Sequence, residues 1–128
     1  MLSWTPFPFT GAYVYDRVCV AQHWKRLHAG DAEPMPGDDA VLQAWAHFHN
    51  GAFQSAFESG LDLGPAGITV ANKACCVYAN YLERSEKSRL ALFLETAERA
   101  RMLATIEPLN PAAWYWQAYA LGRYSQGI

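Results

Sequence analysis

The residues best suited to bind a ligand lie near the end of the chain, where Tyr119 and Arg123 are four positions apart. On a helix, this spacing brings both side chains to one face. The Tyr ring and the guanidinium can then flank a carboxylate or a phosphate, to which the Arg donates paired hydrogen bonds. Packing between helices uses the same residue types, so binding and packing are both open interpretations of this pair.

Other residue types that carry chemistry have spacings that argue against a reactive site. His47 and His49 are two apart, so on a helix they point to nearly opposite sides and do not share a metal ion. Cys75 and Cys76 are adjacent in a helical pattern, which favours small reduced side chains over a disulfide. The sequence contains no phosphate loop, nucleophile elbow or paired-cysteine motif. We therefore predict no catalytic residue, no cofactor, no metal site and no enzymatic activity.

The composition indicates one folded domain. Of the 128 residues, 52% are hydrophobic and 17% are charged, which is typical of a chain with a single core. A net charge of −2 gives no reason to expect nucleic acid or an anionic membrane as a partner. The sequence shows neither a signal peptide nor a run of about 18 apolar residues. Together with three cysteines that do not suggest a disulfide framework, these features predict a cytoplasmic location.

The elements that position these residues are predicted to be helices. Hydrophobic residues at helical spacing indicate helices over 12–28, 40–49, 52–63, 70–83, 87–106 and from Pro111 to about Tyr124. The second to fifth of these form two hairpins, and the last has no partner helix after it. Residues 1–39 are expected to form a strap, a helix and a loop, and residues 40–128 the hairpins.

Two finer expectations concern side chains. Pro6 and Pro8 predict an extended strap from which Trp4, Phe7 and Phe9 lie against the helices.

In the second hairpin, we expect Tyr78 and Tyr81 to point inward. Glu95 and Arg99 are four apart, and we expect this pair on the outer, solvated face of the helix over 87–106.

Three short stretches resemble the tetratricopeptide repeat. Gly51–Ala52–Phe53 is similar to the turn between its two helices, Leu103 to Pro108 is similar to its closing Ala-Leu-x-Leu-x-Pro, and Trp114 stands at the position of its Trp. The resemblance covers residues 40–128 and implies an all-α superhelix of tetratricopeptide-like hairpins with about five helices. The repeats are irregular, because Pro65 and Pro108 are 43 residues apart rather than about 34.

More narrowly, three segments are similar to the amino-terminal part of a group of uncharacterised bacterial repeat-containing proteins. They are Trp24–Asp31, Thr69–Ala74 and Trp114–Ile128.

The repeat resemblance implies a protein or peptide interaction module, because repeat arrays bind partners in a groove lined by the first helix of each hairpin. In that register, the groove is lined by Asn72, Cys76, Asn80, Tyr115, Tyr119 and Arg123. An aromatic last helix without a following partner also predicts one of two arrangements: a homodimer through residues 114–128, or a longer protein of which this chain is the front piece.

An alternative function is small-molecule binding in a pocket between the helices. Five aromatic side chains are candidates for its lining: Trp24, Trp45, Tyr78, Trp114 and Tyr119.

Overall fold

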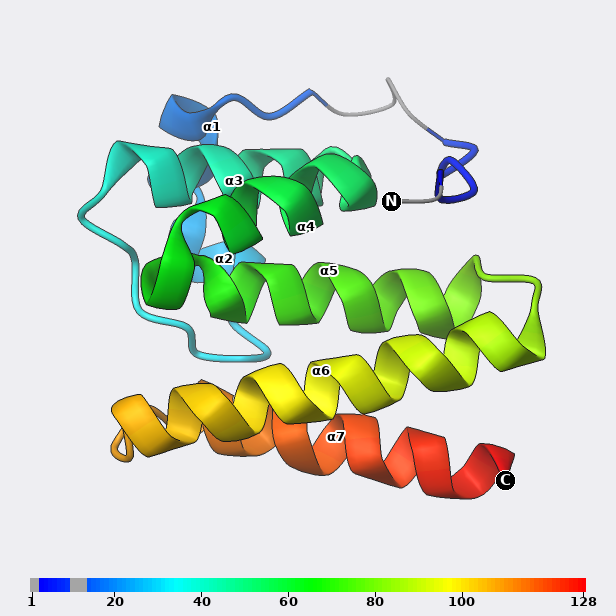
Figure 1. Cartoon of the computed structure of the whole chain (residues 1–128). Helices are drawn as coiled ribbons and strands as arrows, with labels where there is room; N and C mark the ends of the chain where they lie inside the picture. Colours follow the sequence, from blue (N-terminus) through cyan, green and yellow to red (C-terminus); the bar gives the residue numbers. More distant parts are fainter. Residues whose placement is uncertain (1–2, 10–13) are drawn as a thin grey trace.

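The computed structural model describes residues 3–9 and 14–128, and every regular element within them is helical. The elements, in chain order, are α1 (Arg17–Gln22), α2 (Trp24–Leu27), α3 (Asp39–His49), α4 (Phe53–Asp62), a 3₁₀ turn η1 (Gly64–Gly67), α5 (Ile68–Tyr81), α6 (Glu86–Ile106) and α7 (Pro111–Gly127) (Figure 1). The all-α class is therefore confirmed. The described residues form seven α-helices, more than the five or so expected.

The helix predicted over 12–28 is two short helices. The Asp16 carboxylate accepts a hydrogen bond of 2.7 Å from the Cys19 N–H, so it caps α1. At His23 the backbone leaves the helical region, and α2 begins at the next residue. The first two residues of the predicted helix, Ala12 and Tyr13, lie outside the described residues.

From α3 onward, each helix packs against the next one along the chain (Figure 1). The central helix is α5, which contacts α3, α4, α6 and α7. Small side chains such as Ala71, Ala74 and Cys75 are fully buried on it and allow this close packing. Tyr81, which was predicted to point inward, lies at the end of α5 and is 76% exposed. That prediction was wrong because Tyr81 lies on the uncovered side of the last turn, whereas Tyr78 and Ala79 of the same turn are buried.

The last helix, α7, packs against the helix before it. It lies along α6 and buries Ala113, Trp116 and Ala120. Asn110 caps it by accepting a hydrogen bond of 3.1 Å from the Ala112 N–H, and Pro111 occupies the first helical position. The opposite side of α7 remains open, with Trp114 exposed.

The strap of residues 4–9 packs against α4 and α5. The Trp4 indole stacks on the Tyr78 ring with centroids 4.3 Å apart, and Phe7 contacts Phe53 edge to face. The Thr5 N–H donates to the Tyr78 hydroxyl at 3.0 Å. Phe9 contacts Phe7 but is 72% exposed. The expected contact with the helices therefore holds for Trp4 and Phe7, whereas Phe9 is mostly exposed and its ring contacts Phe7.

Candidate functional site

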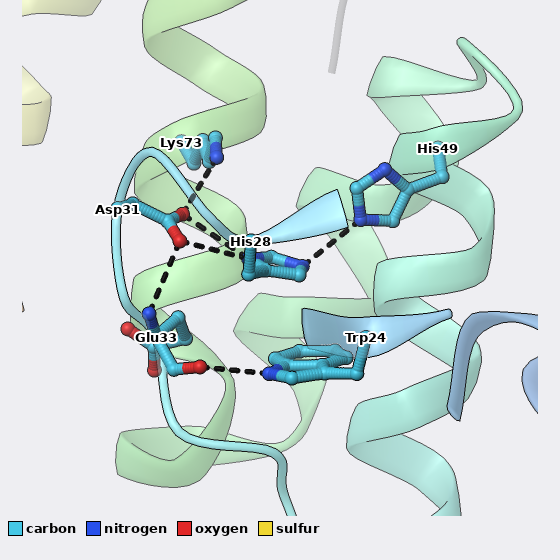
Figure 2. A network of polar contacts seen from close by, with 6 residues as sticks. All are labelled: Trp24, His28, Asp31, Glu33, His49 and Lys73. Atoms are coloured by element: carbon cyan, nitrogen blue, oxygen red, sulfur yellow. Dashed lines mark hydrogen bonds and ion pairs between the residues drawn. The ribbon is translucent and has the colours of Figure 1, made fainter. Parts of the chain in front are cut away.

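The loop that follows α2 is held by polar contacts that join it to two other helices (Figure 2). His28 Nδ1 lies 3.0 Å from Asp31 Oδ1, and Lys73 Nζ of α5 lies 2.7 Å from Asp31 Oδ2. On its other side, His28 Nε2 lies 3.0 Å from His49 Nε2 of α3. Because an ionised carboxylate only accepts, His28 carries a proton on Nδ1, and its Nε2 accepts from His49.

Trp24 holds the same loop from a second direction. Its ring stacks on His28, and its indole N–H donates to the Glu33 carbonyl at 2.7 Å (Figure 2). Between these anchors, Ala32 has a φ of 54°, a left-handed conformation that costs a non-glycine residue about 1–2 kcal/mol. The Ala32 N–H donates to the His28 carbonyl, and the Glu33 N–H donates to Asp31. The loop is thus fixed in a shape that its own backbone preferences do not favour.

This loop forms one wall of a cavity of about 610 Å³. The opposite wall consists of the turn between α6 and α7 and the first two turns of α7. The residues that line the cavity are Gly30, Asp31, Ala32, Glu33, Pro34, Glu107, Leu109, Asn110, Pro111, Ala112, Tyr115 and Trp116. A volume of this size is typical of ligand-binding pockets.

The lining combines carboxylates with exposed apolar groups. Asp31, Glu33 and Glu107 supply three carboxylates, and none of the described lining residues is Lys, Arg or His. Leu109 is 95% exposed and Tyr115 is 56% exposed. An acidic cavity with an accessible aromatic ring is therefore open to solvent beside α7.

The two carboxylates of the loop differ in their partners. Burial alone raises the pKa of Asp31, but hydrogen bonds from Lys73 and from the Glu33 N–H outweigh it, so the pKa is lowered. The Glu33 carboxylate faces away from Trp24 (Figure 2) and has no hydrogen bond or ion pair with any residue in 3–9 or 14–128. Burial, together with the nearby charge of Asp31, raises the pKa of Glu33 to about 7, and Lys73 only partly opposes this.

The histidines of the network are kept neutral. Burial lowers the pKa of His28 and outweighs the attraction of Asp31. Burial also lowers the pKa of His49 to about 4, and the positive charge of Lys73 acts in the same direction. The Lys73 ammonium lies 5.2 Å from the centre of the Phe48 ring, so this cation is held by an aromatic side chain as well as by Asp31.

Three of the predicted binding residues lie together along α7. The Arg123 guanidinium carbon is 5.7 Å from the centre of the Tyr119 ring, and Tyr119 stacks beside Tyr115 with centroids 6.1 Å apart. Of these three, Tyr115 lines the cavity.

The three predicted residues of α5 do not line the cavity. Asn72 is 1% exposed, and its Oδ1 accepts a hydrogen bond of 3.0 Å from Arg99 Nε, so it forms an internal contact between α5 and α6. Cys76 is also 1% exposed, and Asn80 is half-buried. The placement of Asn72 and Cys76 on an open groove is thus corrected, because neighbouring helices surround that part of α5.

The expected outer position of Arg99 is likewise corrected. Its guanidinium lies 4.9 Å from the centre of the Phe57 ring and donates to Thr96 as well as to Asn72. Arg99 therefore links α4, α5 and α6 instead of pairing with Glu95 in solvent.

The five aromatic residues proposed for a small-molecule pocket are also separated. Trp24, Trp45 and Tyr78 are buried in the core, and the strap covers Tyr78. Trp114 is 53% exposed on α7 and donates to the Pro108 carbonyl. Trp24 and Trp45 pack in one buried cluster with α3, whereas Trp114 and Tyr119 lie on α7, which contacts α5 and α6 (Figure 1).

Sequence reasoning missed the cavity and the network behind it. The spacing of His28 and Asp31 was the local signal available, since residues three apart in a helical turn lie close together. Lys73 and Glu107 come from distant elements, and no periodicity relates them to the loop.

Comparisons with protein-family models, with curated proteins and with solved structures find no match to this chain.

In the part of the chain that the structure describes, no helix combines the length and the apolar character needed to cross a bilayer.

Proposed function

We propose that this chain is a non-catalytic interaction module that binds a protein or peptide segment in the cavity between residues 30–34 and α7. The observation that carries the proposal is the position of Tyr115, a residue that is more than half exposed and lines a cavity of about 610 Å³. Leu109, on the same lining, is almost fully exposed. Accessible aromatic and aliphatic side chains around a depression are typical anchors for a partner.

The rest of α7 extends the proposed surface. Tyr119 follows Tyr115 one turn later, and Arg123 lies over Tyr119. A segment that fills the cavity and continues along α7 meets a guanidinium that can donate to a carboxylate or a phosphate.

The packing order supports a tetratricopeptide-like arrangement as part of this proposal. Successive helices from α3 to α7 pack on one another, as in arrays of helical hairpins. Such arrays present one continuous surface to extended peptides, which fits the proposed role.

A homodimer through residues 114–128 remains a second proposal for α7. Trp114, Tyr115 and Leu121 are exposed on it, and a second copy can bury them. Sedimentation equilibrium over a hundredfold range of concentration tests this, with Leu121→Glu expected to yield a monomer. A wild-type chain that stays monomeric throughout contradicts the dimer.

Small-molecule binding is the alternative function for the same cavity, since its volume suits a compact ligand. A ligand that raises the melting temperature of wild type but not of Tyr115→Ala supports it.

The peptide proposal is tested by selecting a displayed library of random nonapeptides on the immobilised chain. We expect wild type to enrich peptides that Tyr115→Ala does not retain. Phe9→Ala is the control, because Phe9 is an aromatic residue that is 72% exposed in the strap and lies outside the cavity lining. Enrichment that is the same on wild type and Tyr115→Ala contradicts the proposed site.

A further inference from the structure

We propose that the cavity beside α7 accepts a basic side chain, lysine or arginine, of the bound segment, and that Glu33 is its counter-charge. This inference rests on the proposed function and adds the chemistry of the occupant.

The carboxylates that line the cavity differ in how their charges are balanced. Asp31 already has a cation, because Lys73 Nζ lies 2.7 Å from its carboxylate. Glu107 has a neutral partner, the Asn110 amide, at 3.1 Å. Among the described residues, the Glu33 carboxylate has neither an ion pair nor a hydrogen bond, although Glu33 is half-buried beside Asp31. Once ionised, above about pH 7, Glu33 therefore gives the cavity excess negative charge that a cation from outside can balance.

The cavity lining also contains apolar groups. Lysine and arginine have an aliphatic stem as well as a charged head, and the stem gains by covering apolar surface. Leu109 and Tyr115 offer that surface at the mouth of the cavity. The open face of the Tyr115 ring also attracts a guanidinium or an ammonium group.

The loop that bears Glu33 is held rigidly. Trp24 holds the Glu33 carbonyl and Asp31 holds the Glu33 N–H, so the backbone that bears the carboxylate is fixed on both sides. A counter-charge that is held in place before binding loses little conformational entropy when the cation arrives.

The test compares two peptides that differ in one charge. A peptide selected on wild type is synthesised with its basic residue as arginine and, separately, as citrulline, which has the same shape without the charge. We expect wild type to bind the arginine peptide about tenfold more tightly, and Glu33→Gln to lose that preference. Glu95→Gln is the matched control, since Glu95 is exposed on α6 outside the lining, and it should keep the preference.

Two results overturn the inference while leaving the proposed function intact. One is a set of Tyr115-dependent peptides with no lysine or arginine at a shared position. The other is an equal affinity of wild type for the arginine and citrulline peptides.

If wild type selects no peptide, the proposed function fails and the cation site is tested alone. Butylguanidinium is then titrated against wild type and Glu33→Gln, with butylurea as the neutral probe, and the side-chain NMR signals of Tyr115 and Trp116 are followed. Saturable shifts with butylguanidinium that need Glu33 support the cation site. Identical responses to both probes, or none, overturn it.

Discussion

The indole of Trp24 lies face to face with the imidazole of His28, with ring centroids 3.8 Å apart and an angle of 15° between the planes. The same indole donates a hydrogen bond to the Glu33 carbonyl. One side chain thus orients both the histidine of the polar network and the backbone of the acidic residue in the cavity.

We expect Trp24→Phe to lower the free energy of unfolding by about 2 kcal/mol, because it removes the hydrogen bond to Glu33 and leaves a void beside His28. Urea denaturation followed by circular dichroism measures this. Trp114→Phe is the matched control: Trp114 also donates to a carbonyl but is 53% exposed, so its loss should cost less than about 0.5 kcal/mol. Equal costs for the two variants contradict the role given to Trp24.

Acid should destabilise the protein through His49. Its pKa is about 4 in the folded chain, against an ordinary value of 6.5 for an unfolded chain, so between these values the unfolded chain binds more protons. The contribution of His49 is fully present above pH 6.5 and is lost as the pH falls toward 4. The lowered pKa of His28 acts in the same direction.

The measurement is the free energy of unfolding of wild type and His49→Gln between about pH 4 and 8. Glutamine cannot titrate and keeps a donor for His28, so the variant should lose less stability on acidification than wild type. His47→Gln, on the same helix but outside the network, should follow wild type. A His49→Gln curve parallel to that of wild type counts against the assignment.

Glu33→Gln should stabilise the chain at high pH. The folded pKa of Glu33 is about 7, against an ordinary value of 4.5 for an unfolded chain, so its contribution is present below pH 4.5 and is lost as the pH rises through 7. Asp31 and Lys73 face this carboxylate, and Glu107 lies across the cavity. We expect a gain on the order of 1 kcal/mol at about pH 8, reduced by solvent screening, and almost none at about pH 4. A loss of stability at the higher pH is the contrary outcome.

Gly60→Ala should cost at least about 2 kcal/mol, because a Cβ at Gly60 lies 2.6 Å from the Gly67 carbonyl oxygen, and two backbones cannot easily separate. This contact joins α4 to the start of α5. Gly122→Ala is the control on α7: nothing lies within 4 Å of its Cβ, so alanine should add about 0.5–1 kcal/mol of stability. Thermal unfolding of both variants measures these two changes in stability.

Helix positions from α3 to α6 could be predicted within about two residues, because local signals define them. The segment predicted over 52–63 is Phe53–Asp62, and that over 87–106 is Glu86–Ile106. The break at His23 could not be predicted in this way. The break accompanies a tertiary contact, the packing of Trp24 and His28 against Trp45. The hydrophobic periodicity of the sequence continues through the break and so does not reveal it.

Site residues could be predicted only where one helix carries them. Their spacing on α7 places Tyr115, Tyr119 and Arg123 next to one another. Asp31 and Lys73 are 42 positions apart, and only the tertiary packing of a loop on α5 brings them together. Asn72 has the polarity of a surface residue, but its helix is enclosed by others, which a single-helix pattern does not reveal.

The contact between the strap and Tyr78 sets an order of events during protein synthesis. Thr5 hydrogen-bonds to a hydroxyl that lies 73 positions later in the chain. A ribosome therefore has to release most of α5 before Trp4 can stack on its partner ring. Until then, the Trp4 ring lacks this stacking partner on the nascent chain, where it is available to chaperones that recognise unfolded apolar segments.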